Sequence, residues 1–187
     1  VGPNKLNDID AVKYQIARIQ AAYTICSAMC SFSCSISSIN NDLSSYAIDA
    51  NSVKAFVTDL MQESSQIALQ LSGAKGYRLD HFAGRAVVDS RPFQIFEGSN
   101  EMLYSQIAEA ICKLMRKSKE SNLLKFLSQY ASTELSAPFF SSLINFDLSE
   151  QIKQRDLVTL GKIIARIVCF QYVLTIQNLG FNDQMTE

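Results

Sequence analysis

The chain has 187 residues, of which 48% are hydrophobic, and its formal net charge is −1. That length suffices for one domain with its own core, and the balanced charge offers no basic face, which argues against a nucleic-acid partner. No stretch has the pattern of a signal peptide or a membrane span. The most apolar segment, 157–181, is interrupted by two cations and two glutamines and is typical of a buried helix.

A first helix is predicted over about residues 8–40, because apolar residues recur there in steps of three and four. Two apolar stripes run along it, so we expect other helices to cover it on both sides. Asn7 or Asp8 is expected as its N-cap. The sequence begins Val-Gly-Pro without an initiator Met, and we expect it to be part of a longer protein.

The first predicted helix carries Cys26, Cys30 and Cys34, which recur every four residues and so lie along one side of it. Disulfide geometry disfavours bridges between such neighbours, and no His or carboxylate in this segment completes a metal site. We therefore expect small, buried, reduced thiols and no metal. Reduced thiols indicate an intracellular compartment, the cytoplasm or the mitochondrial matrix.

A second helix is predicted from about residue 51 to a stop at Gly73. Residues 73–98 carry four of the seven glycines and show no sustained helical period, and a long irregular segment in a helical chain is usually functional. A third helix follows, with Ser99 as its N-cap and Glu101 in its first turn.

Beyond residue 120, short helices are predicted over about 123–130 and 137–144, and a long helix over about 149–179. No alternating strand pattern stands out anywhere in the chain. The sequence therefore predicts an all-α fold, an up-and-down helical bundle.

The stretch Gln-Ile-Phe-Glu-Gly-Ser-Asn-Glu, residues 94–101, places the carboxylate of Glu97 among apolar residues directly before a helix. A carboxylate in such a place suits proton abstraction, and the alternative is a capping carboxylate without chemistry. Gly98 allows another molecule close to the backbone. Ser99 and the N–H groups behind it suit a polar or phosphate-bearing ligand, or form a plain N-cap. His81 has no evident partner, and we assign it no function.

These motifs, in register, resemble the C-terminal domain of the acyl-CoA dehydrogenase family of flavoenzymes. The family pattern reads Gln-x-x-Gly-Gly-x-Gly-Tyr, an Arg, Arg-Asp-x-Arg and then Ile-Tyr-Glu-Gly-Thr-x-Glu. At the same spacing the chain has Gln70, Gly73, Ala74, Gly76, Tyr77, Arg85, Val88, Asp89, Arg91, Ile95, Phe96, Glu97, Gly98, Ser99 and Glu101. Ala74 replaces a Gly and Val88 replaces an Arg, whereas Ser99 keeps the hydroxyl of the family's Thr.

Upstream, the chain resembles the family's long bundle helix less closely, and in all the resemblance covers about residues 5–116. It implies a family-like bundle over residues 1–118, truncated on its N-terminal side, with residues 119–187 as a helical extension packed on it. The family's N-terminal and middle domains, which hold the flavin ring and much of the substrate, are missing. By itself the chain is therefore expected to form half of an active site and to be inactive.

The resemblance implies that Glu97 is the catalytic base. It would remove the α-proton of a fatty acyl-CoA while a hydride passes to FAD, giving a trans-2-enoyl-CoA. The resemblance places Phe96 and Gly98 at the substrate, Ser99, Asn100 and Glu101 at the FAD of the same subunit, and Gln70, Gly73 and Ala74 at the FAD of a neighbouring subunit. It also implies a homodimer or homotetramer with electron-transfer flavoprotein as the electron acceptor, and it leaves an oxidase relative open.

Two alternatives to the enzyme remain. A non-catalytic helical module would keep the bundle for oligomerisation without flavin, which Ala74 and Val88 favour and which Glu97, with its retained neighbours, disfavours. The C-terminal tail would contact a membrane or partner only if its long helix kept an exposed apolar face.

Overall fold

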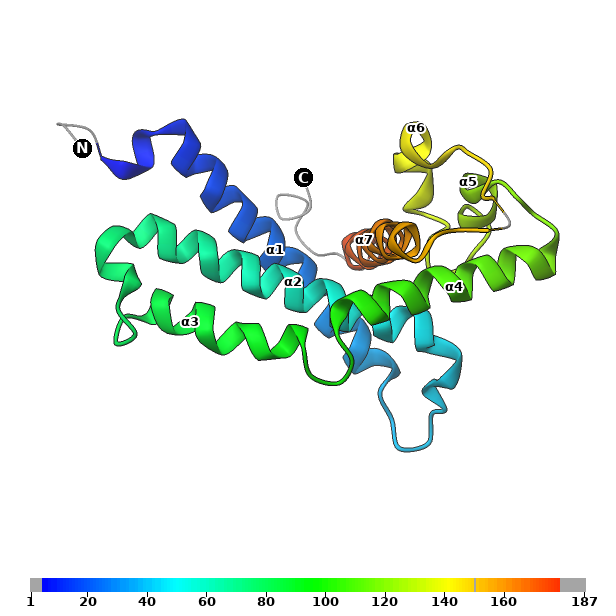
Figure 1. The fold of residues 1–187 in the computed structure, drawn as a ribbon, viewed down its shortest axis with the longest axis horizontal. Coiled ribbons are helices and arrows are strands. Elements are labelled where there is room, and N and C mark those ends of the chain that lie inside the picture. The colour runs from blue at the N-terminus through cyan, green and yellow to red at the C-terminus, as the bar shows by residue number, and fades with distance from the viewer. Residues whose placement is uncertain (1–4, 150, 179–187) are drawn as a thin grey trace.

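The computed structural model describes residues 5–149 and 151–178 of the chain (Figure 1). Four long helices build the frame: α1 (Asp10–Ile36), α2 (Ala47–Ser72), α4 (Asn100–Ser118) and α7 (Gln154–Asn178). The shorter helices are α3 (Phe82–Ser90), α5 (Leu123–Leu127) and α6 (Ser141–Ile144). Five 3₁₀ turns span Leu6–Asp8, Leu43–Tyr46, Gly73–Tyr77, Arg91–Gln94 and Ala137–Phe140. Within the described ranges the only strand-like pairing is one isolated bridge, so the predicted all-α class is confirmed.

The core lies where α7 meets the other long helices. Figure 1 shows α7 nearly end-on, and it packs against α1, α2 and α4, while α3 runs back along α2. Ile107 and Ile111 of α4 and Ile164 and Val168 of α7 are fully buried in this core. The prediction of a buried helix in the most apolar segment is confirmed for residues 157–177, and residues 179–181 lie outside the described part.

Helices α4 and α7 approach each other closely at Gly161. A Cβ atom added to Gly161 would overlap the backbone of Tyr104, whose Cα lies 2.9 Å from the position of that Cβ. Only a residue without a side chain permits this approach of two helices. The next residue on α7, Lys162, places its Nζ 5.6 Å from the centroid of the Tyr104 ring, a favourable cation–π contact.

A second contact ties α7 to α1 and α2. The Tyr172 hydroxyl donates a hydrogen bond to Oδ1 of Asp49, and the Tyr172 ring stacks on Phe32 with centroids 3.8 Å apart. Asp49 is only 2% exposed, and a buried carboxylate needs such a partner. Burial, together with the bond to Asp49, raises the pKa of the Tyr172 hydroxyl, so it remains a protonated donor.

The first half of α1 lies on the surface, which corrects the prediction that this helix is covered on both sides. Tyr14, Ile16 and Tyr23 are exposed, and the buried residues Ala22, Thr24, Ala28 and Met29 all lie beyond Ile16. The reason is that α1 joins the hydrophobic core through its later residues, of which Ala28 and Met29 are buried there. The expected N-cap is also wrong, since Ile9 holds that position.

Two helices, α1 and α7, are long and apolar enough to cross a membrane, although we expected no stretch with that pattern. In α7, 56% of the most apolar 18-residue window is buried, compared with 22% in α1. A core helix meets the same criteria of length and hydropathy, and α7 is one. Among its described residues, α7 exposes one large hydrophobic side chain, Ile163, so it lacks the apolar face that a membrane contact through this helix requires.

Three further predictions need correction. Residues 73–98 are mostly helical rather than irregular. Gly84 in α3 weakens the helical pattern in the sequence, which hid this helix. In the structure Gly84 allows α3 to approach the carbonyl groups of Gly76 and Arg78 closely. The second helix begins at Ala47 instead of near residue 51. All five cysteines are free, but Cys30 and Cys34 are exposed and not buried, since they lie on the uncovered side of α1.

The close approach at Gly161 predicts that Gly161→Ala destabilises the protein. The added methyl group would force α4 and α7 apart, and such overpacking costs about 1–3 kcal/mol. Urea unfolding of the variant measures the loss. The control is Thr159→Ala, which adds no atoms and lies at an exposed position of the same helix. A stability of Gly161→Ala equal to that of the wild type would contradict the crossing geometry.

Candidate active site

Glu97 lies in the loop between the 3₁₀ turn Arg91–Gln94 and α4, and its backbone is in the left-handed region. Its φ is +57° and that of Gly98 is +92°. A positive φ is uncommon for a residue with a side chain and is found more often at functional sites. Two consecutive residues of this kind turn the chain sharply, so that α4 begins directly after the carboxylate.

The Glu97 side chain is exposed, although the residues directly before it are apolar. Those residues do not cover it, because Ile95 and Phe96 are themselves 52% and 67% exposed. Neither the carboxylate nor the backbone N–H of Glu97 makes a hydrogen bond to any residue in the described part of the chain. Both groups therefore remain free for a ligand.

The loop around Glu97 is held from α2 by the carboxylate of Asp59. Gln94, which precedes the loop, donates from Nε2 to Asp59 Oδ1 at 2.7 Å. Asn100, which follows the loop, donates from Nδ2 to the same oxygen at 2.6 Å. The Tyr104 hydroxyl donates to Asp59 Oδ2 at 2.6 Å. Hydrogen bonds to a charged acceptor are short and strong, so one side chain fixes both ends of the loop.

Lys54, one turn before Asp59 on α2, also holds the loop. Its Nζ donates to the Gly98 carbonyl oxygen at 2.7 Å and to Asn100 Oδ1 at 3.0 Å. A Cβ added to Gly98 would lie 3.3 Å from Cδ2 of Leu103, so the loop is also tight against the first turns of α4. The backbone on the C-terminal side of Glu97 is therefore fixed by both charge and packing.

Burial, with the hydrogen bond to Asp59, raises the pKa of the Tyr104 hydroxyl. Tyr104 is 1% exposed and therefore stays a protonated donor at physiological pH. Its backbone is the one that Gly161 approaches, so the α4–α7 crossing also sets the position of this donor.

Asn100 faces α2 rather than the surface. Its side chain is buried, and the amide nitrogen donates to the Ala55 carbonyl oxygen at 2.9 Å in addition to Asp59. Its oxygen accepts from Lys54. The structure thus uses the Asn100 side chain inside the chain, although the resemblance placed it at FAD.

Ser99 is the N-cap of α4, as predicted: its hydroxyl accepts a hydrogen bond from the Met102 N–H, although this bond is long at 3.4 Å. Glu101 lies exposed in the first turn. Ser99 is half-buried, so of these two residues only Glu101 is exposed.

Gln70, Gly73 and Ala74 lie at the far end of α2, and all three are exposed. Figure 1 shows that the chain turns there into α3, so these residues and the Glu97 loop lie at opposite ends of α3. Eleven residues separate Asp59 from Gln70, which is about 16 Å along a helix. The structure therefore does not bring the two predicted cofactor segments together within one chain.

Phe96 borders a shallow hollow of about 490 Å³ between α2, α3 and the turn before the Glu97 loop. Val87, Val88 and Ile95 supply most of its remaining apolar surface. Val88, which replaces the family's Arg, is exposed at this hollow, so the replacement adds apolar surface there.

Sequence reasoning missed Lys54, Asp59 and Tyr104. One signal was present: Lys54, Thr58 and Asp59 are polar residues grouped within two turns of a helix whose neighbours are largely apolar. Their partners are 35–46 residues away along the chain, and periodicity contains no information on such distant pairs.

The family model described as "Acyl-CoA dehydrogenase, C-terminal domain" matches residues 2–112, which is more than half of the chain. A search of curated proteins found no match, and neither did a search of solved structures. The matched range contains the Glu97 loop, the contacts that hold it to α2 and both predicted cofactor segments. The chain therefore belongs to the acyl-CoA dehydrogenase family, through the C-terminal domain of that family.

Proposed function

We propose that this chain is the C-terminal domain of an FAD-dependent acyl-CoA dehydrogenase and that Glu97 is its catalytic base. The observation that carries the proposal concerns Glu97: neither its carboxylate nor its backbone N–H has a hydrogen-bond partner among the described residues, and its loop is fixed on both sides from α2. A capping carboxylate would instead be hydrogen-bonded to the helix that it precedes. A free, positioned carboxylate is suited to general-base catalysis.

Two groups of Glu97 would act on the substrate. The carboxylate would take the α-proton of the acyl thioester, and the backbone N–H would donate to the thioester carbonyl oxygen. That donor would stabilise the negative charge that develops on the oxygen as the proton leaves. The positive φ of Glu97 supports this arrangement, because the fixed turn determines where both groups point.

FAD would supply the hydride acceptor. The residues present fit it as two separate half-sites, because the half-buried Ser99 and the exposed Glu101 lie at one end of α3 and the exposed Gln70, Gly73 and Ala74 at the other. A Cβ added at Gly73 meets nothing within 4 Å, so the second segment is open to an approaching molecule. The separation supports a homodimer or homotetramer in which each FAD lies between two subunits.

The assignment of cofactor contacts changes at one position. Because its side chain is already hydrogen-bonded to Lys54, Asp59 and Ala55, we assign Asn100 to holding the loop rather than to FAD. Phe96 and the apolar hollow beside it would contact the acyl chain, and Gly98 would leave room for the thioester. All five cysteines are free, which supports a reducing, intracellular compartment.

The test is the visible absorption spectrum of the full-length protein, recorded anaerobically before and after a panel of fatty acyl-CoAs is added. We expect a yellow protein that bleaches with its preferred chain length. We expect Glu97→Gln to bind FAD but to bleach at least about a hundredfold more slowly, since positioned general bases contribute about 10²–10⁴-fold. Bleaching of the variant at the wild-type rate would place the base elsewhere, and a colourless protein would favour the non-catalytic module.

The Asp59 contacts predict a second variant. Asp59→Asn keeps the shape of the side chain but replaces the charged acceptor of Gln94, Asn100 and Tyr104. We expect flavin reduction to slow by about ten- to a hundredfold, because a displaced base loses rate steeply, while FAD content stays normal. Stopped-flow absorbance measures the rate. Glu63→Gln on the same helix removes a surface ion pair with Arg18 and is the control; an equal effect of both changes would refute the role of Asp59.

A further inference from the structure

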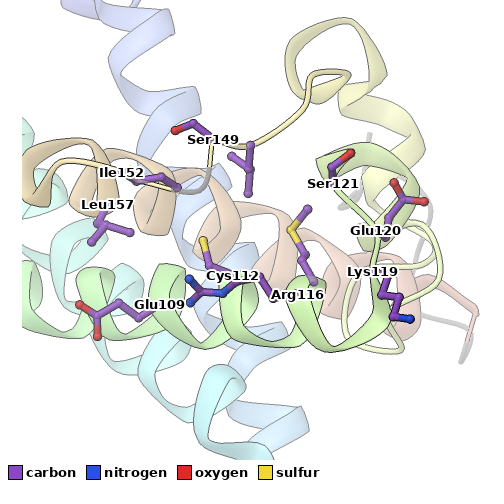
Figure 2. Close-up of a pocket in the computed structure, with 11 residues that line it drawn as sticks. Glu109, Cys112, Arg116, Lys119, Glu120, Ser121, Ser149, Ile152 and Leu157 are labelled. Atoms are coloured by element: carbon purple, nitrogen blue, oxygen red, sulfur yellow. The ribbon is translucent and has the colours of Figure 1, made fainter.

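A cavity of about 340 Å³ lies at the end of α4 that is remote from Glu97 (Figure 2). One wall is the C-terminal half of α4, and the other is formed by Leu148, Ser149 and Ile152 before α7 and by Leu157 in its first turn. Fifteen residues separate Glu97 from Cys112 at this cavity, which is about 22 Å along a helix. The cavity is therefore separate from the candidate active site.

Most of the cavity surface is apolar, although charged and hydroxyl side chains also line it. Met115 is buried at its base, and Leu148, Ile152 and Leu157 are half-buried around it. Cys112 points its thiol into the same space from α4 (Figure 2). Its volume lies at the lower end of the range for small-molecule sites, so the space suits a compact apolar group.

Two cations, Arg116 and Lys119, border this cavity. Figure 2 shows the Arg116 side chain folding back along α4, with its guanidinium beside Cys112. Arg116 forms no ion pair with any residue in the ranges 5–149 and 151–178. Glu120 also borders the cavity, but one of its carboxylate oxygens already accepts the Asn122 N–H at 2.8 Å. A guanidinium is well shaped to bind a carboxylate through two parallel hydrogen bonds.

We propose that this cavity binds a small molecule with an apolar body and a single carboxylate, whose carboxylate pairs with Arg116. The apolar walls take the body, and the guanidinium takes the charge. This site is distinct from the proposed reaction and does not depend on it.

The remaining charges at the cavity define the class of ligand. Among the described lining residues, Arg116 and Lys119 are balanced by Glu109 and Glu120, so a polyanion such as a nucleotide would meet as much repulsion as attraction. In the described part of the chain no group of three or more His, Cys, Asp or Glu side chains is placed to hold a metal ion. A monocarboxylate is a class that meets both conditions.

Cys112 makes the proposal testable without knowledge of the natural ligand. The full chain is treated with N-ethylmaleimide at increasing concentrations of octanoate, and labelling of each cysteine is followed by peptide mass spectrometry. Because burial raises the pKa of the Cys112 thiol, the reaction is run at mildly alkaline pH. Cys30, which is exposed on α1, is the internal control in the same molecule. We expect octanoate to slow the labelling of Cys112 and to leave Cys30 unchanged.

Two variants separate binding through the charge from general apolar association. In Arg116→Gln we expect the octanoate concentration that halves the rate of Cys112 labelling to rise about tenfold. This is the change in affinity expected for the loss of one charge-assisted hydrogen bond. Lys117→Gln removes a neighbouring cation of α4 that does not line the cavity. In this variant octanoate should protect Cys112 from labelling as it does in the wild type. Octan-1-ol, which lacks the carboxylate, should protect weakly and equally in all three proteins.

Three results would overturn the proposal. Octanoate would fail to slow Cys112 labelling at any concentration, or it would slow Cys112 and Cys30 alike, or it would protect Arg116→Gln as well as the wild type. None of these results would bear on Glu97, because the flavin spectrum is measured independently.

Discussion

The carboxylate of Asp59 is the contact on which the candidate site depends. Three donors from the two sides of the Glu97 loop and from α4 converge on it, within 2.6–2.7 Å. The arrangement concentrates the polar contacts on residues next to Glu97 and leaves Glu97 without any described partner. A catalytic site needs a reactive side chain that is free to contact the substrate and neighbouring residues that hold its backbone in place.

The tail of the chain contributes to the same arrangement from the other side. The family model matches residues 2–112, and α7 lies wholly beyond that range. Yet Gly161 of α7 packs on the backbone of Tyr104, and Lys162 lies over its ring. Tyr104 in turn donates to Asp59. The extension is therefore part of the core that supports the Glu97 loop, rather than an appendage on a finished bundle.

Local features of the fold could be predicted from the sequence, and distant contacts could not. Ser99 was recognisable as an N-cap and α7 as a buried helix, because capping and hydrophobic content are properties of a few neighbouring residues. The prediction that other helices cover α1 on both sides was wrong, since an apolar stripe does not indicate how many helices pack against it. The exposure of Glu97 was missed for the same reason: it follows from the turn geometry and from what packs over Phe96.

The most direct test of the account is whether Glu97 removes a proton from the α-carbon of a bound acyl-CoA. The full-length protein is incubated anaerobically in D₂O with an acyl-CoA analogue that cannot be oxidised, and exchange at the α-carbon is followed by NMR. The account predicts exchange in the wild-type protein and none above background in Glu97→Gln. Equal exchange in both proteins would contradict it, because the proton would then be leaving to some other group.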